Sequence, residues 1–186
     1  MRARAVVMKE QAALPFPMSV TVGRVRPGEP PRNVFNNVGS LGQTRPTTFG
    51  FAAAAMETAL ITLRPATRAD LNFLDELYTA AMRPYFEATR TWNPLLFRIT
   101  FDEAVSSVIQ YGGKDIGFLK VRREPESIFL GDIQVLPEYR NRGIGTHIIH
   151  GILEEAKASG VMVWLKVLKG NPARGLYERL GFTVAE

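Results

Sequence analysis

Apolar and polar residues follow regular periods only from about residue 60 onward. Residues 61–64 alternate as a strand does. Thr67 and Asp70 have the spacing of a capping box, which predicts that a helix begins there. The apolar face of that helix would be formed by Leu71, Leu74, Leu77, Tyr78 and Ala81. Pro84 is expected to end it.

The middle of the chain has the alternation of a strand meander. A second capping signature at residues 100–103 predicts another short helix before it. Residues 107–111 and 115–121 flank a Gly-Gly turn and predict a hairpin, and residues 127–135 predict a third strand.

The last third of the chain alternates between helix and strand patterns. Residues 143–159 have a helical period, with Gly160 as the terminator. Residues 161–167 predict a buried strand, and Asn171 followed by proline predicts the start of a final short helix. A strand, a helix and a strand in succession imply one parallel crossover. We therefore predict an α/β fold with a mixed, mostly antiparallel central sheet and flanking helices.

The first 55 residues lack this patterning and hold six of the twelve prolines. Residues 18–25 could form one short strand, for which we expect no partner. We therefore predict two parts, a basic leader at residues 1–59 and a folded domain at residues 60–186. The leader would be disordered or a gene-start artefact, with translation beginning at Met56. A transit sequence is a third interpretation, which only two serines support.

Charge and composition exclude several classes of protein. Residues 1–55 hold seven basic and two acidic residues, which accounts for the whole net charge of +5. The neutral remainder argues against a nucleic-acid partner. The absence of cysteine excludes disulfides and thiolate nucleophiles and fits a reducing, cytoplasmic location. No apolar run reaches the roughly 18 residues of a membrane helix. His147 and His150 have no evident third ligand, so we expect no metal site.

The most informative segment joins the strand at 127–135 to the helix at 143–159. The strand is expected to end at a proline, and a short polar loop follows it. Gly143 and Gly145 lie where this loop meets the start of the helix. Unpaired amides at a helix N-terminus bind anions, and Arg140 and Arg142 add positive charge. The alternative is that the two glycines only permit tight packing of helix on sheet. A dinucleotide fingerprint and a Walker loop both need residues that are missing here.

Residues 140–145, Arg-Asn-Arg-Gly-Ile-Gly, resemble the Arg/Gln-x-x-Gly-x-Gly/Ala signature of the GNAT superfamily of N-acyltransferases. Residues 133–137 are similar to the splayed central strand of that family, and residues 171–182 to its C-terminal motif. The resemblance covers residues 60–186. It implies an N-acetyltransferase that transfers an acetyl group from acetyl-CoA to a small-molecule or protein amine. A homodimer is an open expectation.

The resemblance also assigns cofactor contacts. The pantetheine arm would pair with the backbone of strand 127–135, and the pyrophosphate would bind amides of the loop that follows. The residues so assigned are Ile133, Val135, Arg140, Asn141, Arg142, Gly143, Ile144, Gly145, Thr146 and Asn171.

Two residues are candidates for proton transfer. Tyr177 would protonate the leaving thiolate, and its alternative role is a core aromatic that packs against Phe182. Asp132 is the acidic residue of strand 127–135 and is the candidate base, although an ordered water could serve instead. Its alternative role is a structural carboxylate bonded to a loop amide or to Arg98. Simple alternation places Asp132 on the same strand face as Leu130.

Two expectations concern the acceptor site and the end of the chain. Aromatic residues that could form an acceptor wall, or could equally be core residues, are Tyr85, Phe86, Trp92 and Trp164. Relatives in the resembled family continue past the Gly-Phe motif into another strand, whereas this sequence stops at Glu186. A missing final strand would favour a non-catalytic acyl-CoA-binding module as the alternative function.

Overall fold

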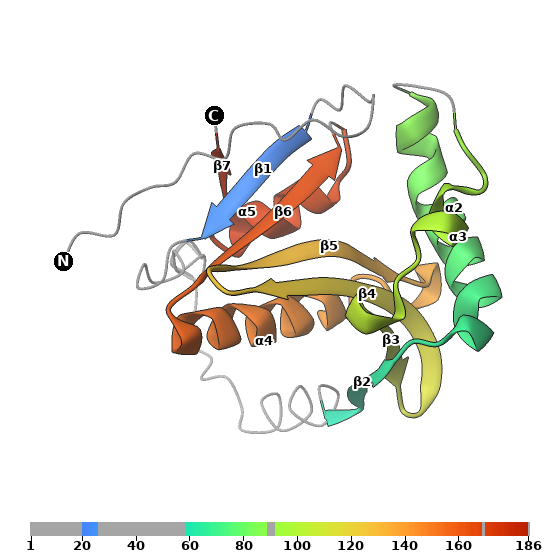
Figure 1. The fold of residues 1–186 in the computed structure, drawn as a ribbon, viewed down its shortest axis with the longest axis horizontal. Helices are drawn as coiled ribbons and strands as arrows, with labels where there is room; N and C mark the ends of the chain where they lie inside the picture. The colour runs from blue at the N-terminus through green and yellow to red at the C-terminus, as the bar shows by residue number, and fades with distance from the viewer. Residues whose placement is uncertain (1–19, 26–58, 89–91, 169, 186) are drawn as a thin grey trace, which may run out of the picture.

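The computed structural model describes residues 20–25, 59–88, 92–168 and 170–185, and these form a seven-stranded sheet with helices on both faces (Figure 1). The strand order is β2-β3-β4-β5-β6-β1-β7. Only β5 and β6 are parallel, and the other neighbours are antiparallel. The strands are β1 (Val20–Val25), β2 (Ile61–Pro65), β3 (Ser106–Tyr111), β4 (Lys114–Glu124), β5 (Ser127–Val135), β6 (Met162–Leu168) and β7 (Thr183–Ala185). The predicted mixed, mostly antiparallel sheet is confirmed.

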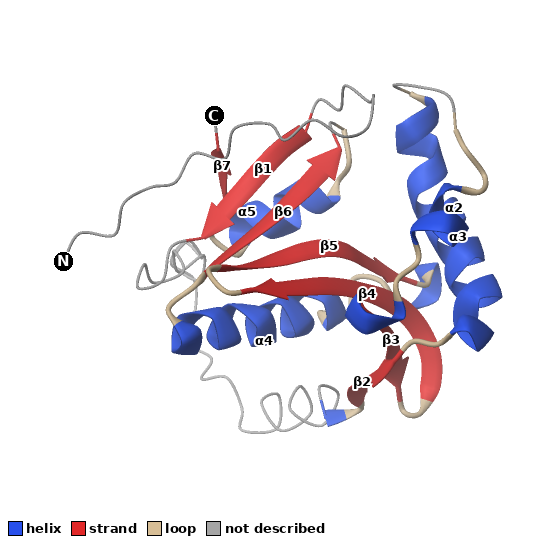
Figure 2. Cartoon of the chain, viewed as in Figure 1, coloured by secondary structure: helices blue, strands red, loops and turns tan. Residues whose placement is uncertain are grey.

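The helices divide between the two faces of this sheet (Figure 2). They are α2 (Leu71–Glu87), α3 (Leu96–Thr100), α4 (Ile144–Ser159) and α5 (Ala173–Arg179), with short 3₁₀ turns at η1 (Arg68–Asp70), η2 (Glu103–Val105) and η3 (Pro137–Tyr139). The buried apolar residues form two clusters, one on each face of the sheet, and adjacent residues of β4 belong to different clusters. Leu119 packs with α4 residues such as Ile149, whereas Phe118 packs with Leu74 of α2. Successive strand residues point to opposite faces, so α2 and α4 cover different sides.

The helix boundaries are only partly as predicted. The capping box of Thr67 and Asp70 is present, with Arg64 holding the Asp70 carboxylate. The expectation that Pro84 ends the first helix is wrong, because α2 continues to Glu87. A proline near a helix end removes one hydrogen bond without preventing a last turn. The second capping signature does not start an α-helix, because Thr100 is the last residue of α3 and Asp102 caps only the turn η2, by accepting from the Ala104 amide.

Strand β1 overturns two expectations about the ends of the chain. It pairs with β6 over six residues, from Val20 opposite Leu168 to Val25 opposite Val163. Its other edge pairs with β7, the final strand that the sequence was expected to lack. The first and last described strands, β1 and β7, thus lie side by side (Figure 1). Residues 20–25 are therefore part of the sheet, and the rest of the predicted leader up to residue 58 lies outside the described residues.

No helix among the described residues is both long and apolar enough to cross a membrane.

Candidate functional site

A gap in the sheet forms the centre of the site. The parallel pairing of β5 with β6 runs from Ser127 opposite Met162 to Leu130 opposite Leu165, and it extends no further among the described residues. The Leu136 amide donates to Ile116 O at the β4 edge, at 2.8 Å. Because successive backbone groups of a strand point to opposite neighbours, the polar groups of residues 133 and 135 face the gap.

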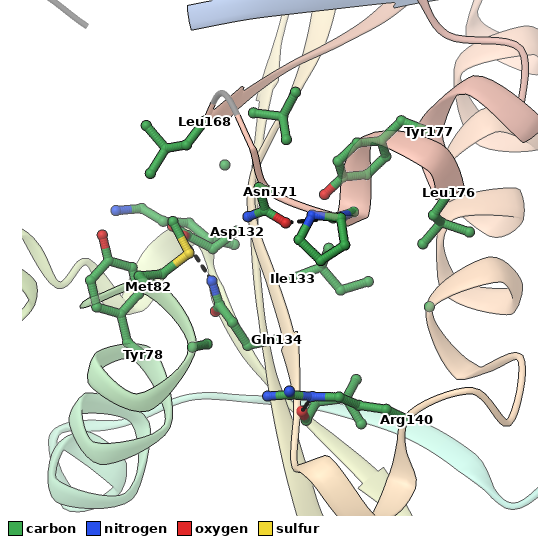
Figure 3. A pocket seen from close by; sticks show the side chains of 18 of the residues that line it. Tyr78, Met82, Asp132, Ile133, Gln134, Arg140, Leu168, Asn171, Leu176 and Tyr177 are labelled. Carbon is green, nitrogen blue, oxygen red and sulfur yellow. Dashed lines mark hydrogen bonds between the residues drawn. The ribbon is translucent and has the colours of Figure 1, made fainter. Parts of the chain in front are cut away.

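A cleft of about 770 Å³ extends along this gap and collects most of the predicted site residues (Figure 3). Its lining comes from α2, β4, β5, β6, α5 and the N-terminus of α4. Among the predicted cofactor residues, Arg142 is the one that does not line it. The Arg142 guanidinium lies 5.2 Å from the ring centroid of Tyr139 instead.

The loop before α4 has the geometry of an anion-binding nest. Asn141 and Gly143 both have positive φ, at 60° and 78°. Such backbone conformations next to a helix start create a concave set of amides. The first backbone bond of α4 runs from the His147 amide to Gly143 O, so the amides before His147 have no acceptor within the helix. Arg140 braces the loop, since its Nε donates to Val135 O at 2.8 Å.

The structural reason for glycine differs between positions 143 and 145. Position 143 favours glycine because its φ lies in the left-handed region, which residues with a Cβ rarely adopt. A Cβ on Gly145 would meet its nearest atom, Leu176 Cδ2, at 3.5 Å, which is ordinary van der Waals contact. Helix packing on the sheet therefore does not require glycine at position 145. Gly145 also lines the cleft, where the absence of a side chain would let a diphosphate approach the backbone.

A β-bulge orients Asp132. The β4–β5 register pairs Lys120 with Asp132 and Val121 with Leu130, so Gly131 has no residue opposite it. One extra residue reverses the alternation of side chains beyond the bulge. The expectation that Asp132 shares a face with Leu130 is therefore wrong. Asp132 lies on the α2 side with Phe129, and Leu130 lies in the α4 core.

The Asp132 carboxyl has one direct partner in the described part of the chain. Gln134 Nε2 donates to its Oδ1 at 3.2 Å, as the dashed line in Figure 3 marks. Burial raises the pKa of Asp132, and the Gln134 hydrogen bond and the Lys120 charge oppose that effect. Arg98 is not its partner, because Arg98 binds Asp75. A carboxylate with a raised pKa is a competent base.

Tyr177 packs as the alternative core aromatic would, and it also lines the cleft. Its ring packs edge-on against Phe182, with centroids 5.8 Å apart, as a core aromatic would. Its hydroxyl points into the cleft (Figure 3). Burial and the Asp132 charge raise the pKa of Tyr177 to about 12, so the phenol is protonated at neutral pH.

Asn171 and two of the predicted acceptor aromatics line the cleft, whereas the other two aromatics do not. Asn171 Oδ1 accepts from the Ala173 amide at 2.9 Å, which caps α5, while the residue also lines the cleft. Of the four aromatic residues predicted for the acceptor wall, Tyr85 and Phe86 line the cleft, and Trp92 and Trp164 do not. Trp92 packs against Phe86 with centroids 5.5 Å apart, and Trp164 stacks on Phe129 at 4.1 Å.

Several residues that line the cleft were not identified from the sequence: Met82, Lys120, Arg122, Phe129, Gln134, Lys166 and Arg179. The alternation along β4 could have placed Lys120 and Arg122 on one face, but no pattern reveals that this face borders the gap. Within the described ranges, no group of three or more potential metal ligands occurs.

Comparison with known proteins agrees with this geometry. Residues 71–182 match the family model described as Acetyltransferase (GNAT) family, and the chain belongs to that family. An uncharacterized N-acetyltransferase of Methanocaldococcus jannaschii is 32% identical, over 81% of this chain and 75% of its own length. The ribosomal protein bS18-alanine N-acetyltransferase of Haemophilus influenzae is 35% identical over 36% of this chain and 47% of its own length.

Solved structures extend the likeness. The ribosomal-protein-S18-alanine N-acetyltransferase of Escherichia coli is 25% identical, with a TM-score of 0.52, over 68% of this chain and 79% of its own. Arabidopsis thaliana Naa50, solved with a CoA-peptide bisubstrate analogue, has a TM-score of 0.51 over 68% of this chain and 85% of its own. At 18% identity, that second likeness shows the fold alone.

Proposed function

We propose that this chain transfers an acetyl group from acetyl-CoA to a primary amine by direct attack, with Asp132 as base and Tyr177 as acid. The observation that carries the proposal is that Asp132 and Tyr177 both line the cleft at the gap between β5 and β6 (Figure 3). The same cleft is lined both by the loop before α4 and by residues of α2. Membership of the GNAT acetyltransferase family supports the reaction class.

The residues around the gap fit coenzyme A. The amides between Asn141 and Thr146 would hold the pyrophosphate, and Gly145 leaves room for its approach. The strand edge at Ile133 and Val135 offers backbone groups to the pantetheine amides, in the place where β6 has diverged. Asn171 lies beside this path. Arg142 is not included in this proposal, because its side chain lies over Tyr139.

The amine must lose a proton as it attacks the thioester carbon. Asp132 accepts that proton, directly or through a water, and burial strengthens it as a base by raising its pKa. The new C–N bond forms as the C–S bond breaks. Tyr177 then donates its hydroxyl proton to the departing thiolate, and the neutral phenol adds no charge that would repel the cofactor's phosphates. Asp132 then releases its proton to solvent and the Tyr177 phenolate takes one up, which restores both residues.

The alternative, a non-catalytic acyl-CoA-binding module, loses its main argument. That argument was an incomplete sheet, and β1 and β7 complete the sheet beside β6. The two ribosomal-protein enzymes are named for an alanine acceptor, so an α-amino group is the acceptor to test first. A cytoplasmic location and a homodimer stay predictions.

The test is Tyr177→Phe, which keeps the ring and removes the hydroxyl. Thiol release from acetyl-CoA is measured against a panel of α-amines, diamines and amino sugars. We expect kcat to fall by about 10²-fold, near the lower limit for general-acid catalysis because a thiolate leaves readily. The affinity for coenzyme A should not change.

Tyr111→Phe is the matched control, because Tyr111 packs on Tyr139 at 5.9 Å and does not line the cleft. Equal kcat values for the two variants would refute the acid role of Tyr177. A wild-type protein that binds coenzyme A but acetylates no amine would instead support the binding-module alternative.

A further inference from the structure

The half of the cleft farthest from the anion-binding loop is also positively charged. Among the described residues that line the cleft, Asp132 is the one acidic side chain. The basic side chains in the lining are Lys120, Arg122, Arg140, Lys166 and Arg179. Arg140 lies in the loop before α4 and Arg179 lies on α5. The other three lie on β4 and β6, at the side of the cleft where an acceptor would enter.

Two of these cations flank an aromatic platform. Arg122 is opposite Phe129 in the β4–β5 register, and Phe129 is opposite Trp164 in the β5–β6 register. The two rings stack with centroids 4.1 Å apart and planes tilted by 30°. The Lys166 ammonium lies 5.9 Å from the Trp164 ring centroid. Arg122, Phe129 and Trp164 therefore form one row across three strands, and Lys166 lies two residues beyond Trp164 along β6.

Neither cation has a carboxylate partner in the part of the chain that the structure describes. Most other described arginines do form ion pairs: Arg64, Arg68, Arg83, Arg98, Arg123 and Arg174. Lys120 is also engaged, since its Nζ donates to Thr100 O at 3.2 Å and its charge acts on Asp132. Arg122 and Lys166 are thus the side chains left to meet an anion that enters this half of the cleft.

We propose that Arg122 and Lys166 bind a carboxylate carried by the amine acceptor, so that the acceptor is an acidic amine. This inference rests on the proposed acetyl transfer. Lys120 is opposite Asp132, and Arg122 is two residues further along β4, which is about 7 Å along the strand. An amine held at Asp132 would then have its carboxylate within reach of the guanidinium. A peptide with an acidic second residue fits this spacing, and so does a short amino acid.

The same charge distribution disfavours polycationic acceptors. A polyamine or an aminoglycoside would place a second ammonium beside Arg122 and Lys166, where like charges repel. The repulsion would be strongest at low ionic strength, because salt screens exposed charges. Selection therefore operates against a second positive charge as well as for a negative one.

The experiment compares acceptors that differ in one charge. Alanyl-aspartyl amide, its neutral counterpart alanyl-asparaginyl amide and its cationic counterpart alanyl-lysyl amide are assayed with wild type, Arg122→Gln and Lys166→Gln. We expect wild type to prefer the acidic dipeptide. In each variant, the KM for the acidic dipeptide should rise about three- to tenfold, the range of a partly exposed charge-assisted contact. The KM of the asparaginyl dipeptide should not change. Four-aminobutanoate tests whether a small amino acid supplies the carboxylate instead of a peptide.

Lys157→Gln is the matched control, because it removes one positive charge from the far side of α4 without touching the cleft. Equal KM values for acidic and neutral dipeptides would overturn the inference while leaving acetyl transfer intact.

A second measurement does not depend on turnover. Binding of the N-acetylated acidic dipeptide to the coenzyme A complex is followed by calorimetry. Binding that weakens in Arg122→Gln would support the carboxylate site even if no dipeptide is acetylated, in which case the proposed function alone fails. No binding, or binding unaffected by either substitution, would refute the site.

Discussion

The two ends of the cleft are built from different parts of the chain. In the proposed function, the cofactor end would use backbone amides of one continuous loop, in which Asn141 and Gly143 have positive φ. The acceptor end would use side chains from α2, β4, β5 and β6, among them Lys120, Arg122 and Lys166. Backbone binding suits a ligand that every relative shares, because it depends on conformation and not on side-chain identity. Side chains from separate elements can change one at a time, which suits an acceptor that differs between relatives.

The largest effect should come from the group at the border between the two ends. Asp132→Asn should lower kcat by about 10²–10⁴-fold, the usual contribution of a positioned base, because the amide cannot accept the proton. Coenzyme A affinity should remain within about twofold, since Asp132 lies outside the anion-binding loop.

The pH profile provides the check on this assignment. Wild-type kcat/KM should rise with pH through the raised pKa of Asp132, and this rise should be absent in the variant. A variant that retains both the rate and the wild-type profile would exclude Asp132 as the base.

Removing β1 should have the next largest effect, and it should fall unequally on the two ends. Beyond Leu165, β6 has β1 as its one ladder partner among the described strands, through pairs such as Val22 with Lys166. A protein that starts at Met56 should lose about 2 kcal/mol or more of stability, because six strand pairs disappear. Binding of the acidic dipeptide should weaken more than binding of coenzyme A. An unchanged melting temperature would show that β1 contributes nothing to the sheet.

A smaller effect should be confined to the cofactor end. Gly145→Val should weaken coenzyme A binding about tenfold, or 1.4 kcal/mol, because a branched side chain fills the space beside the helix start. KM for the amine should change little. Gly151→Val is the matched control, since Gly151 is in the same helix and a Cβ there meets no atom within 4 Å. If both variants bind coenzyme A equally well, the anion-binding loop is wrongly assigned.

The smallest effect concerns stability. The folded-state pKa of Asp132 is above its unfolded value, so its contribution to stability is fully present below the unfolded pKa and falls as pH rises through the folded pKa. Asp132→Asn cannot ionise, so the variant does not lose stability in this way as pH rises. The variant should therefore melt at a temperature equal to or above that of wild type near pH 8, with a smaller difference near pH 4. A variant less stable at pH 8 would indicate that the carboxylate is structural.

The same contrast between the two ends explains what the sequence could predict. The resemblance rests on short sequence motifs, and most of the residues it assigned, in the loop before α4, at positions 133 and 135 and at Tyr177, do line the cleft. The face of Asp132 was mispredicted because the bulge at Gly131 depends on the register with β4. Lys166 and Arg122 were missed because their proximity depends on tertiary packing of three strands. Trp92 could not be distinguished from an acceptor residue by its side chain alone.

The position of β1 has a consequence for how the protein is made. Its residues leave the ribosome before any other described strand, yet both of its neighbours, β6 and β7, are about 140 or more residues later in the chain. Contacts so distant in sequence form slowly, because a long loop must close first. Residues 20–25 therefore have no partner strand until β6 and β7 have been synthesised. After that point, the edge of β6 stays exposed until residues 20–25 pair with it. An exposed strand edge can pair with another chain, so conditions that speed synthesis or crowd nascent chains should favour aggregation at this step.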